Sequence, residues 1–323
     1  MEDVVFSNWL DIDLGGSKLA TRFNNQMLIY TTPPNQLDCL SLIDSLITTH
    51  QAQGCAIASP GNINNEGVIA PNSARNLSTN PSAWDSFNWI HWLSERVTQY
   101  VVINDAMAQL LGCLPPTPFP NETIGYIGPG TGLGGGFVQL ENATLRPISD
   151  GHIFDIMLEK DPYDRWASTP WVMAEDVLSG RGYNDRVGTP LSDTHHPDRL
   201  RYATLMGRYL RQLISRLRAG SPTKQIGPQW QDTDIQKIQR VSKWVVGGGI
   251  INHADVGECI QKEWPPHEWV QWIREPINTC FAGLDFLKLE RYGRHSRIRL
   301  DNAETASSVW ALYSDARNPP ADR

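Results

Sequence analysis

Nine residues in the middle of the chain, Gly128–Gly136, include six glycines and separate two apolar segments. Glycine lets the backbone adopt positive φ angles and lets another group approach the main-chain amides closely. A glycine-rich turn between two strands can therefore present a row of N–H donors to an anion, and phosphate is the first candidate. For this run taken alone, a flexible hairpin tip is the competing interpretation.

Two further glycine turns follow predicted strands, at Gly15-Gly16 and at Gly247–Gly249. Asp13 directly precedes the first of these turns, and Asp105 follows the short apolar strand predicted at Tyr100–Ile103. An acidic residue at a strand end faces a cleft more often than a core. Asp105 could also be the N-cap of the next helix, a position that Asp favours and that would fix its side chain. The three turns and two aspartates together favour the phosphate interpretation.

The two commonest nucleotide-binding signatures are absent from the sequence. It contains neither a Gly-x-x-x-x-Gly-Lys-Ser/Thr loop nor a strict dinucleotide fingerprint that opens a helix. Glycines open hairpins here instead. This favours a fold in which paired hairpin turns hold the phosphates.

The elements that must position these residues alternate between strands and helices. Predicted strands cover Val4–Leu14, Lys18–Tyr30 (one or two strands), Gly54–Ser59, Tyr100–Ile103, Thr123–Leu140 (two strands and a turn) and Lys243–Val246. Apolar residues at helical spacing predict helices over Leu37–His50, Ser86–Gln99, Ala106–Leu114, Trp171–Leu178, Asp198–Arg218 and Ala303–Ala316. Irregular structure is expected over Asn62–Asn76 and Ser221–Asp234. The alternation predicts an α/β fold with mixed sheets and helices outside them.

A proline-rich stretch, Leu114–Pro120, ends the preceding predicted helix and marks a boundary. The plan of strand, glycine turn and strand occurs on both sides of it. We expect a smaller N-terminal lobe of residues 1–115, with the first turn and Asp105, and a larger C-terminal lobe of residues 116–323, with the other two turns. The final helix, 303–316, could return to the first lobe.

Composition argues against a nucleic-acid-binding protein and against a membrane protein. The 323 residues are 40% hydrophobic and carry a net charge of −7, which argues against nonspecific binding to nucleic acid. The five cysteines are scattered without zinc-ligand or redox spacing, which fits a reducing, cytoplasmic location. We find no signal peptide and no apolar run near the ~20 residues that span a bilayer, so no membrane partner is expected.

Six segments resemble, in the same order, motifs of sugar kinases of the actin–hexokinase–Hsp70 superfamily, most closely the ROK family and bacterial glucokinases. The segments are Ile12–Leu19, Ser59–Gly61 with Gly67–Asn72, Ile103–Ala106, Gly130–Gly136, Ala174–Gly180 and Val245–Gly249. The resemblance implies a two-lobed actin-like ATPase fold, a duplicated ribonuclease H-like fold with an interdomain cleft. It also implies a role in carbohydrate metabolism such as glycolysis, and it allows a homodimer.

The activity that the resemblance implies is phosphoryl transfer from ATP to a hydroxyl of glucose or a related hexose. Asp105 would be the general base, and Asp13 would orient hydrated Mg²⁺. Amides of the turns would bind the phosphates, and the third turn would admit the nucleoside; these positions are Gly15, Gly16, Ser17, Gly130, Thr131, Gly132, Gly134, Gly248 and Gly249. The expected sugar contacts are Asn72, Asn104, Asp105, His152, Asp155 and Glu175. The expected partners are thus a small-molecule sugar and a nucleotide.

One stretch departs from the family pattern. Where the family has Gly-Glu-x-Gly-His, the sequence has Gly151–Asp155, so that His152 replaces the glutamate and Asp155 the histidine. Both could still bind sugar hydroxyls, or they could simply pair with each other. Glu175, which matches the family's later sugar-binding glutamate, is retained. Between Asp155 and Glu175 there is no cysteine, so no structural zinc is expected, and the absence of an N-terminal winged-helix segment argues against a DNA-binding repressor.

Two other functions remain open beside the hexose kinase. A sugar-binding sensor or pseudokinase would keep the fold and change the sugar site, as the stretch around His152 suggests. A third class keeps the fold but changes the acceptor, as in acyl-group kinases or in activators of other enzymes. Such activators hold iron–sulfur clusters through cysteines, and the separated cysteines give this class little support.

Overall fold

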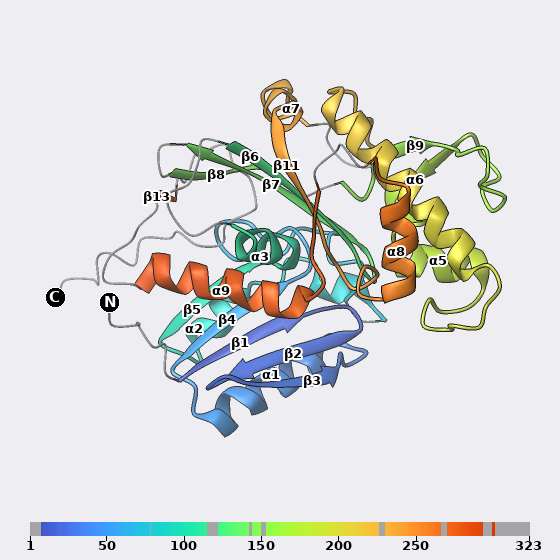
Figure 1. Cartoon of the computed structure of the whole chain (residues 1–323). Coiled ribbons are helices and arrows are strands. Elements are labelled where there is room, and N and C mark those ends of the chain that lie inside the picture. Colours follow the sequence, from blue (N-terminus) through green and yellow to red (C-terminus); the bar gives the residue numbers. More distant parts are fainter. Residues whose placement is uncertain are drawn as a thin grey trace. The chain divides into compact units, whose positions relative to one another are not determined.

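The computed structural model describes residues 8–77, 79–114, 122–141, 144–149, 153–225, 230–265, 270–292 and 299–300. The chain divides into two compact units. The first consists of Met1–Gly112 together with Cys280–Arg323, and the second is Cys113–Thr279. Each unit has its own mixed sheet with helices, which is the α/β organisation that the sequence predicts (Figure 1).

The sheet of the first unit has the strand order β3-β2-β1-β4-β5. Its strands are β1 (Trp9–Leu14), β2 (Lys18–Phe23), β3 (Gln26–Thr31), β4 (Gly54–Ser59) and β5 (Gln99–Asn104). Strands β1, β2 and β3 are antiparallel, whereas β1, β4 and β5 are parallel. The carboxyl ends of these three parallel strands therefore meet at one edge of the sheet, the edge where open α/β sheets bind ligands.

Helices of the first unit are α1 (Gln36–His50), α2 (Trp89–Ser94) and α3 (Asp105–Gly112), with a 3₁₀ turn at Pro81–Trp84. The helix α9 (Pro276–Tyr292) comes late in the chain, and its residues from Cys280 onward belong to this unit. Helix α2 is shorter than the predicted helix Ser86–Gln99, because Ser86 adopts positive φ and the Asn88 side chain caps the helix through the His91 N–H.

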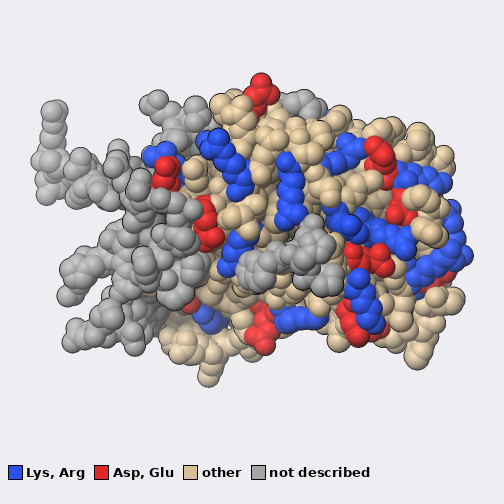
Figure 2. Space-filling model, turned by 45° about the horizontal axis from the view of Figure 1, so that its top comes forward, with Lys and Arg blue, Asp and Glu red and all other residues tan. Residues whose placement is uncertain are grey.

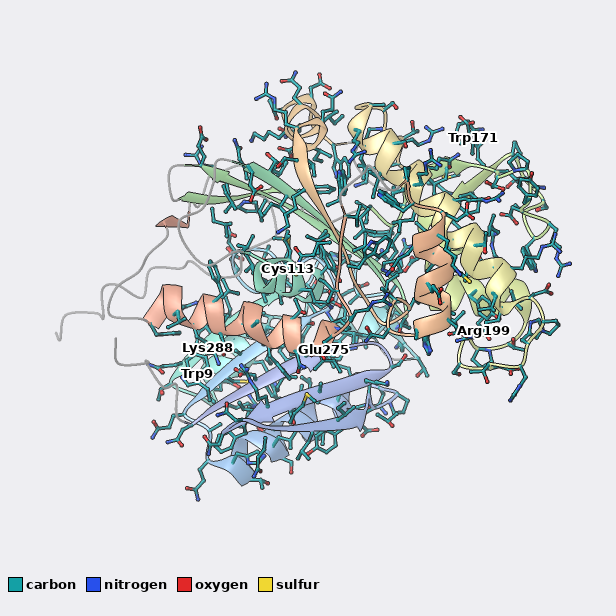
Figure 3. The ribbon with its side chains drawn as sticks, viewed as in Figure 1. Trp9, Cys113, Trp171, Arg199, Glu275 and Lys288 are labelled. Atoms are coloured by element: carbon teal, nitrogen blue, oxygen red, sulfur yellow. The ribbon has the colours of Figure 1, made fainter. Side chains whose placement is uncertain are left out.

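Helix α9 is held to the first sheet by buried charges. The Lys288 ammonium lies 2.8 Å from Asp11 Oδ1 on β1, and both side chains are almost fully buried. Arg22 on β2 donates to the other carboxylate oxygen of Asp11 at 2.9 Å. Lys288 also lies over the ring of Trp9, 5.6 Å from its centre (Figure 3). A buried carboxylate needs such partners, so α9 and β1 depend on each other.

The strands of the second unit's main sheet follow the order β12-β11-β6-β7-β8. They are β6 (Glu122–Pro129), β7 (Leu133–Glu141), β8 (Thr144–Ser149), β11 (Val241–Val246) and β12 (Val270–Trp272). β9 (Met157–Glu159) and β10 (Trp171–Met173) form a separate pair. The helices are α4 (Ala174–Leu178), α5 (Gly180–Val187), α6 (Arg199–Arg218), α7 (Asp232–Gln239) and α8 (Ala254–Lys262). Buried side chains of the long helix α6, including Leu210 and Leu213, belong to the core of this unit.

Several sequence predictions need correction. The helix predicted over Trp171–Leu178 begins only at Ala174, because Trp171–Met173 pairs with β9 and Val172 is buried there. Helix α7 begins inside the predicted loop Ser221–Asp234. Helices α5, α8 and α9 and strands β8, β9 and β12 were not predicted. The predicted helix Ala303–Ala316 and the start of the strand Val4–Leu14 lie outside the described residues, where β13 (Arg299–Leu300) is the last described element.

Basic and acidic side chains are interspersed over the face of the molecule in Figure 2. Of the helices that the structure describes, none combines the length and the apolar character needed to cross a bilayer.

Candidate active site

Asp13 and Asp105 lie at the same edge of the first sheet. Asp13 pairs in register with Ala58 on β4, and Ala58 pairs with Ile103 on β5. Asp105 follows two residues after Ile103, as the first residue of α3. Parallel pairing thus brings together two carboxylates that are far apart in sequence.

Burial and mutual repulsion favour the protonated forms of this pair. Burial raises the pKa of Asp13 to about 7, helped by the negative charge of Asp105 and opposed by a hydrogen bond from the Cys280 thiol on α9. Burial also raises the pKa of Asp105 to about 6, opposed by hydrogen bonds from main-chain N–H groups, including that of Ala106 at 2.8 Å. A carboxylate that titrates near neutral pH is suited to proton transfer, and a pair of them attracts a cation.

The Asn104 side chain fixes the start of α3. Its Oδ1 accepts a hydrogen bond from the Met107 N–H at 3.2 Å, the contact of an N-cap. Its Nδ2 donates to the carbonyl of Gly61 at 3.0 Å, in the turn after β4. The cap predicted for Asp105 is therefore made by Asn104. Asn104 positions Asp105 by joining two strand ends.

The first glycine turn is held on both sides. The Gly15 N–H donates to the Lys18 carbonyl at 2.9 Å, and Thr32 Oγ1 donates to the Gly15 carbonyl at 2.6 Å. A Cβ on Gly16 would collide with the carbonyl oxygen of Asn76, so a larger residue would push the neighbouring loop away. Ser17 is exposed at the tip. The backbone therefore holds the tip in one conformation.

The second glycine run is partly strand. Gly134 pairs with Gly128 across the β6–β7 hairpin, and the run's last three glycines belong to β7. A Cβ on Gly135 would lie 2.5 Å from Cδ1 of Ile153, so close packing explains that glycine. At the tip, the Gly130 N–H donates to the Gly132 carbonyl at 2.8 Å. This tip is a closed turn.

The third glycine turn packs directly on the second. The Gly247 N–H donates to the Ile127 carbonyl at 3.0 Å, and the Ile250 N–H donates to the Pro129 carbonyl at 3.1 Å. Gly248 has a φ of 85°, and a Cβ there would collide with the Pro129 carbonyl. Glycine is therefore required at 248 for both its conformation and its close approach. Main-chain hydrogen bonds thus join the second and third turns directly.

Helix α5, which sequence reasoning missed, begins against the tip of the second turn. The Gly180 N–H donates to the Gly130 carbonyl at 2.8 Å, and the Arg181 N–H donates to the Thr131 carbonyl at 3.1 Å. Ser179 Oγ caps the helix by accepting from the Gly182 N–H at 2.9 Å. The serine at this position is an N-cap signal that could have revealed the helix.

The expected sugar contacts are divided between the units. Glu175 is the second residue of α4 and is buried, and its Oε2 lies 3.0 Å from a guanidinium nitrogen of Arg181. Asp155 is buried as well, and its Oδ1 lies 3.8 Å from the ammonium of Lys224. Asn72, in the first unit, is exposed with positive φ, and its N–H donates to Asp85 Oδ1 at 2.8 Å.

The structure describes only part of the stretch Gly151–Asp155, in which His152 and Asp155 could pair with each other. His152 lies outside the described residues, so its pairing with Asp155 is not tested. The ion pair of Asp155 with Lys224 was not foreseen, since Lys224 lies in the predicted loop. An isolated bridge between Ile156 and Lys224 brings the two segments together. Asp155 is thus part of the unit's interior.

The donor set suits magnesium better than a multi-ligand metal centre. Among the described residues, no group of three or more His, Cys, Asp or Glu side chains could hold a metal ion. Mg²⁺ is usually held by one or two carboxylates, several waters and the substrate's phosphates. Asp13 and Asp105, with the glycine turn Gly15–Ser17 next to Asp13 in the chain, fit that requirement.

Comparison with known proteins gives no match in sequence and clear matches in structure. No protein-family model matches the chain, and no curated protein does. A ROK family glucokinase from Streptomyces griseus, solved with glucose and AMPPNP, matches with a TM-score of 0.59 and 18% identity over 85% of this chain and 97% of that one. A Balamuthia mandrillaris glucokinase solved with glucose matches with a TM-score of 0.58 and 14% identity over 88% and 94%.

A third similar structure is the inorganic polyphosphate/ATP-glucomannokinase from Arthrobacter sp. strain KM. It matches with a TM-score of 0.53 and 19% identity, over 86% of this chain and 96% of that one. At these identities the likeness concerns the fold. Over most of its length, the chain has the actin-like ATPase fold of ROK-family sugar kinases.

Proposed function

We propose that the protein is an ATP-dependent kinase that phosphorylates a hydroxyl of a hexose, with glucose or a close relative as acceptor. The observation that carries the proposal is the pair of Asp13 and Asp105 at the carboxyl edge of the parallel strands, next to the turn Gly15–Ser17. The fold shared with glucokinases supports it, as does the AMPPNP bound to the Streptomyces griseus enzyme.

In this proposal Asp105 is the general base. Its carboxylate accepts the proton of the sugar hydroxyl while that oxygen forms a bond to the γ-phosphorus and the bond to the ADP oxygen breaks. Asn104 holds Asp105 in place through its two hydrogen bonds. The N–H groups of Gly15, Gly130 and Gly247 already donate to main-chain carbonyls, so phosphate oxygens would be bound by other N–H groups of the glycine turns. Asp13 would hold hydrated Mg²⁺, which neutralises phosphate charge when bound.

A screen for sugar-dependent ADP release tests the proposal. Purified protein is assayed with MgATP and with hexoses, N-acetylhexosamines and keto sugars, beside the variants D105N and D105A. A lost general base lowers kcat by about 100-fold or more. The matched control is D44N, which removes an exposed carboxylate that pairs with Arg96 on the surface. Turnover that survives in D105A would refute the assigned mechanism.

A sugar-binding sensor of the same fold is the second candidate, and its support is the altered stretch Gly151–Asp155 on the sugar side. Asp155, an expected sugar ligand, is buried in an ion pair with Lys224. Calorimetry with the same sugars, with and without MgATP, separates the two functions. Binding of a sugar without turnover of any sugar would favour the sensor.

A further inference from the structure

Arg181 contacts both the donor-side turn and an expected acceptor ligand within the second unit. Its main-chain N–H donates to the Thr131 carbonyl at the tip of the second glycine turn, at 3.1 Å. Its guanidinium lies 3.0 Å from Glu175 Oε2. No motif in the sequence singled out this arginine.

The ion pair is asymmetric in its exposure. The Glu175 side chain is 3% exposed, whereas that of Arg181 is 38% exposed. Removing a charged partner of a buried carboxylate is far more costly than losing a surface ion pair. Loss of Arg181 should therefore destabilise the Glu175 carboxylate more than loss of Glu175 destabilises the Arg181 guanidinium.

The local backbone fixes the geometry of this pair. Ser179 caps α5, and a Cβ on Gly182 would collide with the carbonyl oxygen of Asp176, so the turn between α4 and α5 is tight. The Gly180 N–H adds a second bond to the glycine turn, at the Gly130 carbonyl. Two main-chain hydrogen bonds therefore join the tip of the glycine turn to the first two residues of α5, one of which is Arg181.

We propose that Arg181 is a positioning residue that holds the Glu175 carboxylate in place for the sugar and couples sugar binding to nucleotide binding through Thr131. This inference rests on the proposed function. Glu175 accepts sugar hydroxyls while the guanidinium balances its charge. Phosphates bound at the glycine turn restrain Arg181 through its main-chain bond to Thr131, and by reciprocity the sugar strengthens nucleotide binding by the same factor.

A double-mutant cycle on sugar affinity tests the inference. The proteins are wild type, R181Q, E175Q and R181Q/E175Q, with R181K as the variant that keeps the charge but loses the planar fork. R211Q is the matched control, because Arg211 is exposed on α6. Isothermal titration calorimetry measures the dissociation constants of glucose, mannose and N-acetylglucosamine, and of MgAMPPNP, each with and without the other ligand.

We expect R181Q to weaken sugar binding about tenfold and to abolish the enhancement of sugar binding by MgAMPPNP. MgAMPPNP affinity without sugar should stay within about twofold of wild type, because the main-chain bond to Thr131 survives the substitution. In the E175Q background, R181Q should change sugar affinity by less than about twofold. R181K should fall between wild type and R181Q, and it replaces R181Q in the cycle if that variant unfolds.

The results that would overturn the inference can be distinguished from one another. If a sugar binds wild type and R181Q equally well, or if the effects of R181Q and E175Q add in full, the positioning role is wrong and the proposed kinase stands. If none of the sugars binds wild type, the inference and the proposed function fall together. Equal weakening of sugar and nucleotide by R181Q would show a merely structural role and would also overturn the inference.

Discussion

Replacing Gly248 by alanine should break the contact between the second and third glycine turns. Gly248 has a φ of 85°, and a residue with a side chain pays about 1–2 kcal/mol for that conformation. Its Cβ would collide with the Pro129 carbonyl oxygen and lie 2.7 Å from the carbonyl carbon, so the turn must move. The movement would cost the hydrogen bonds from Gly247 and Ile250, at about 0.5–1.5 kcal/mol each.

Together these contributions predict that G248A lowers the free energy of unfolding by about 2–5 kcal/mol. Two other glycines separate the causes. Gly188 has a φ of 84° with no atom within 4 Å of a Cβ, so G188A should lose only the conformational part, about 1–2 kcal/mol. A Cβ on Gly249 also meets no atom within 4 Å, and its φ lies outside the left-handed region, so G249A should change stability by less than about 0.5 kcal/mol.

Urea unfolding followed by tryptophan fluorescence measures all three variants. Circular dichroism before unfolding checks that each has native secondary structure. If G248A costs no more than G188A, close approach of the two turns contributes nothing to stability, and the reasoning fails. A large loss of stability in G249A would show that something other than positive φ and close contact of the Cβ excludes side chains from this turn.

The remaining predictions concern protonation and the buried charges of the first unit. Because the pKa values of Asp105 and Asp13 are raised to about 6 and about 7, kcat/KM for the sugar should fall as pH decreases through this range, since the protonated base cannot accept the hydroxyl proton. A profile that is flat from about pH 5 to 8 would contradict the assignment of Asp105. K288M should lower the free energy of unfolding in urea by about 1.5–3 kcal/mol, because Asp11 loses the hydrogen bonds of its buried ammonium partner but keeps those of Arg22. K262M should change it by less than about 0.5 kcal/mol, because Lys262 is 68% exposed, and equal losses in the two variants would refute the argument.

The parts of the site that the sequence predicts are those with a local signal. Glycine runs between apolar strands mark the turns, and the aspartates stand directly at strand ends. The closeness of Asp13 and Asp105 follows from parallel pairing, which strand alternation already suggests. The proximity of the two aspartates at the carboxyl ends of the first sheet's parallel strands could therefore be predicted from the sequence.

Contacts between distant segments had no such signal. Lys224 pairs with Asp155 from within a polar segment that resembles a loop. Helix α9 has apolar residues on all sides, so its pattern shows no helical face. Arg181 lies in α5, whose polar composition hides the helix, and its partner Glu175 belongs to a different helix. In each case tertiary packing, and not a local sequence pattern, determines the contact or the helix.

The late position of α9 in the chain has a consequence for biosynthesis. Because the first unit contains residues from both ends of the chain, the second unit is an insertion within it. A ribosome that has released residues 1–112 has released β1 with Asp11 and its partner Arg22, but neither the second partner, Lys288, nor the thiol that donates to Asp13. The second unit is contiguous and can finish folding first. The first unit, although it begins the chain, can be completed only after synthesis has passed α9, and a fragment that ends before this helix cannot form the Asp13 environment described above.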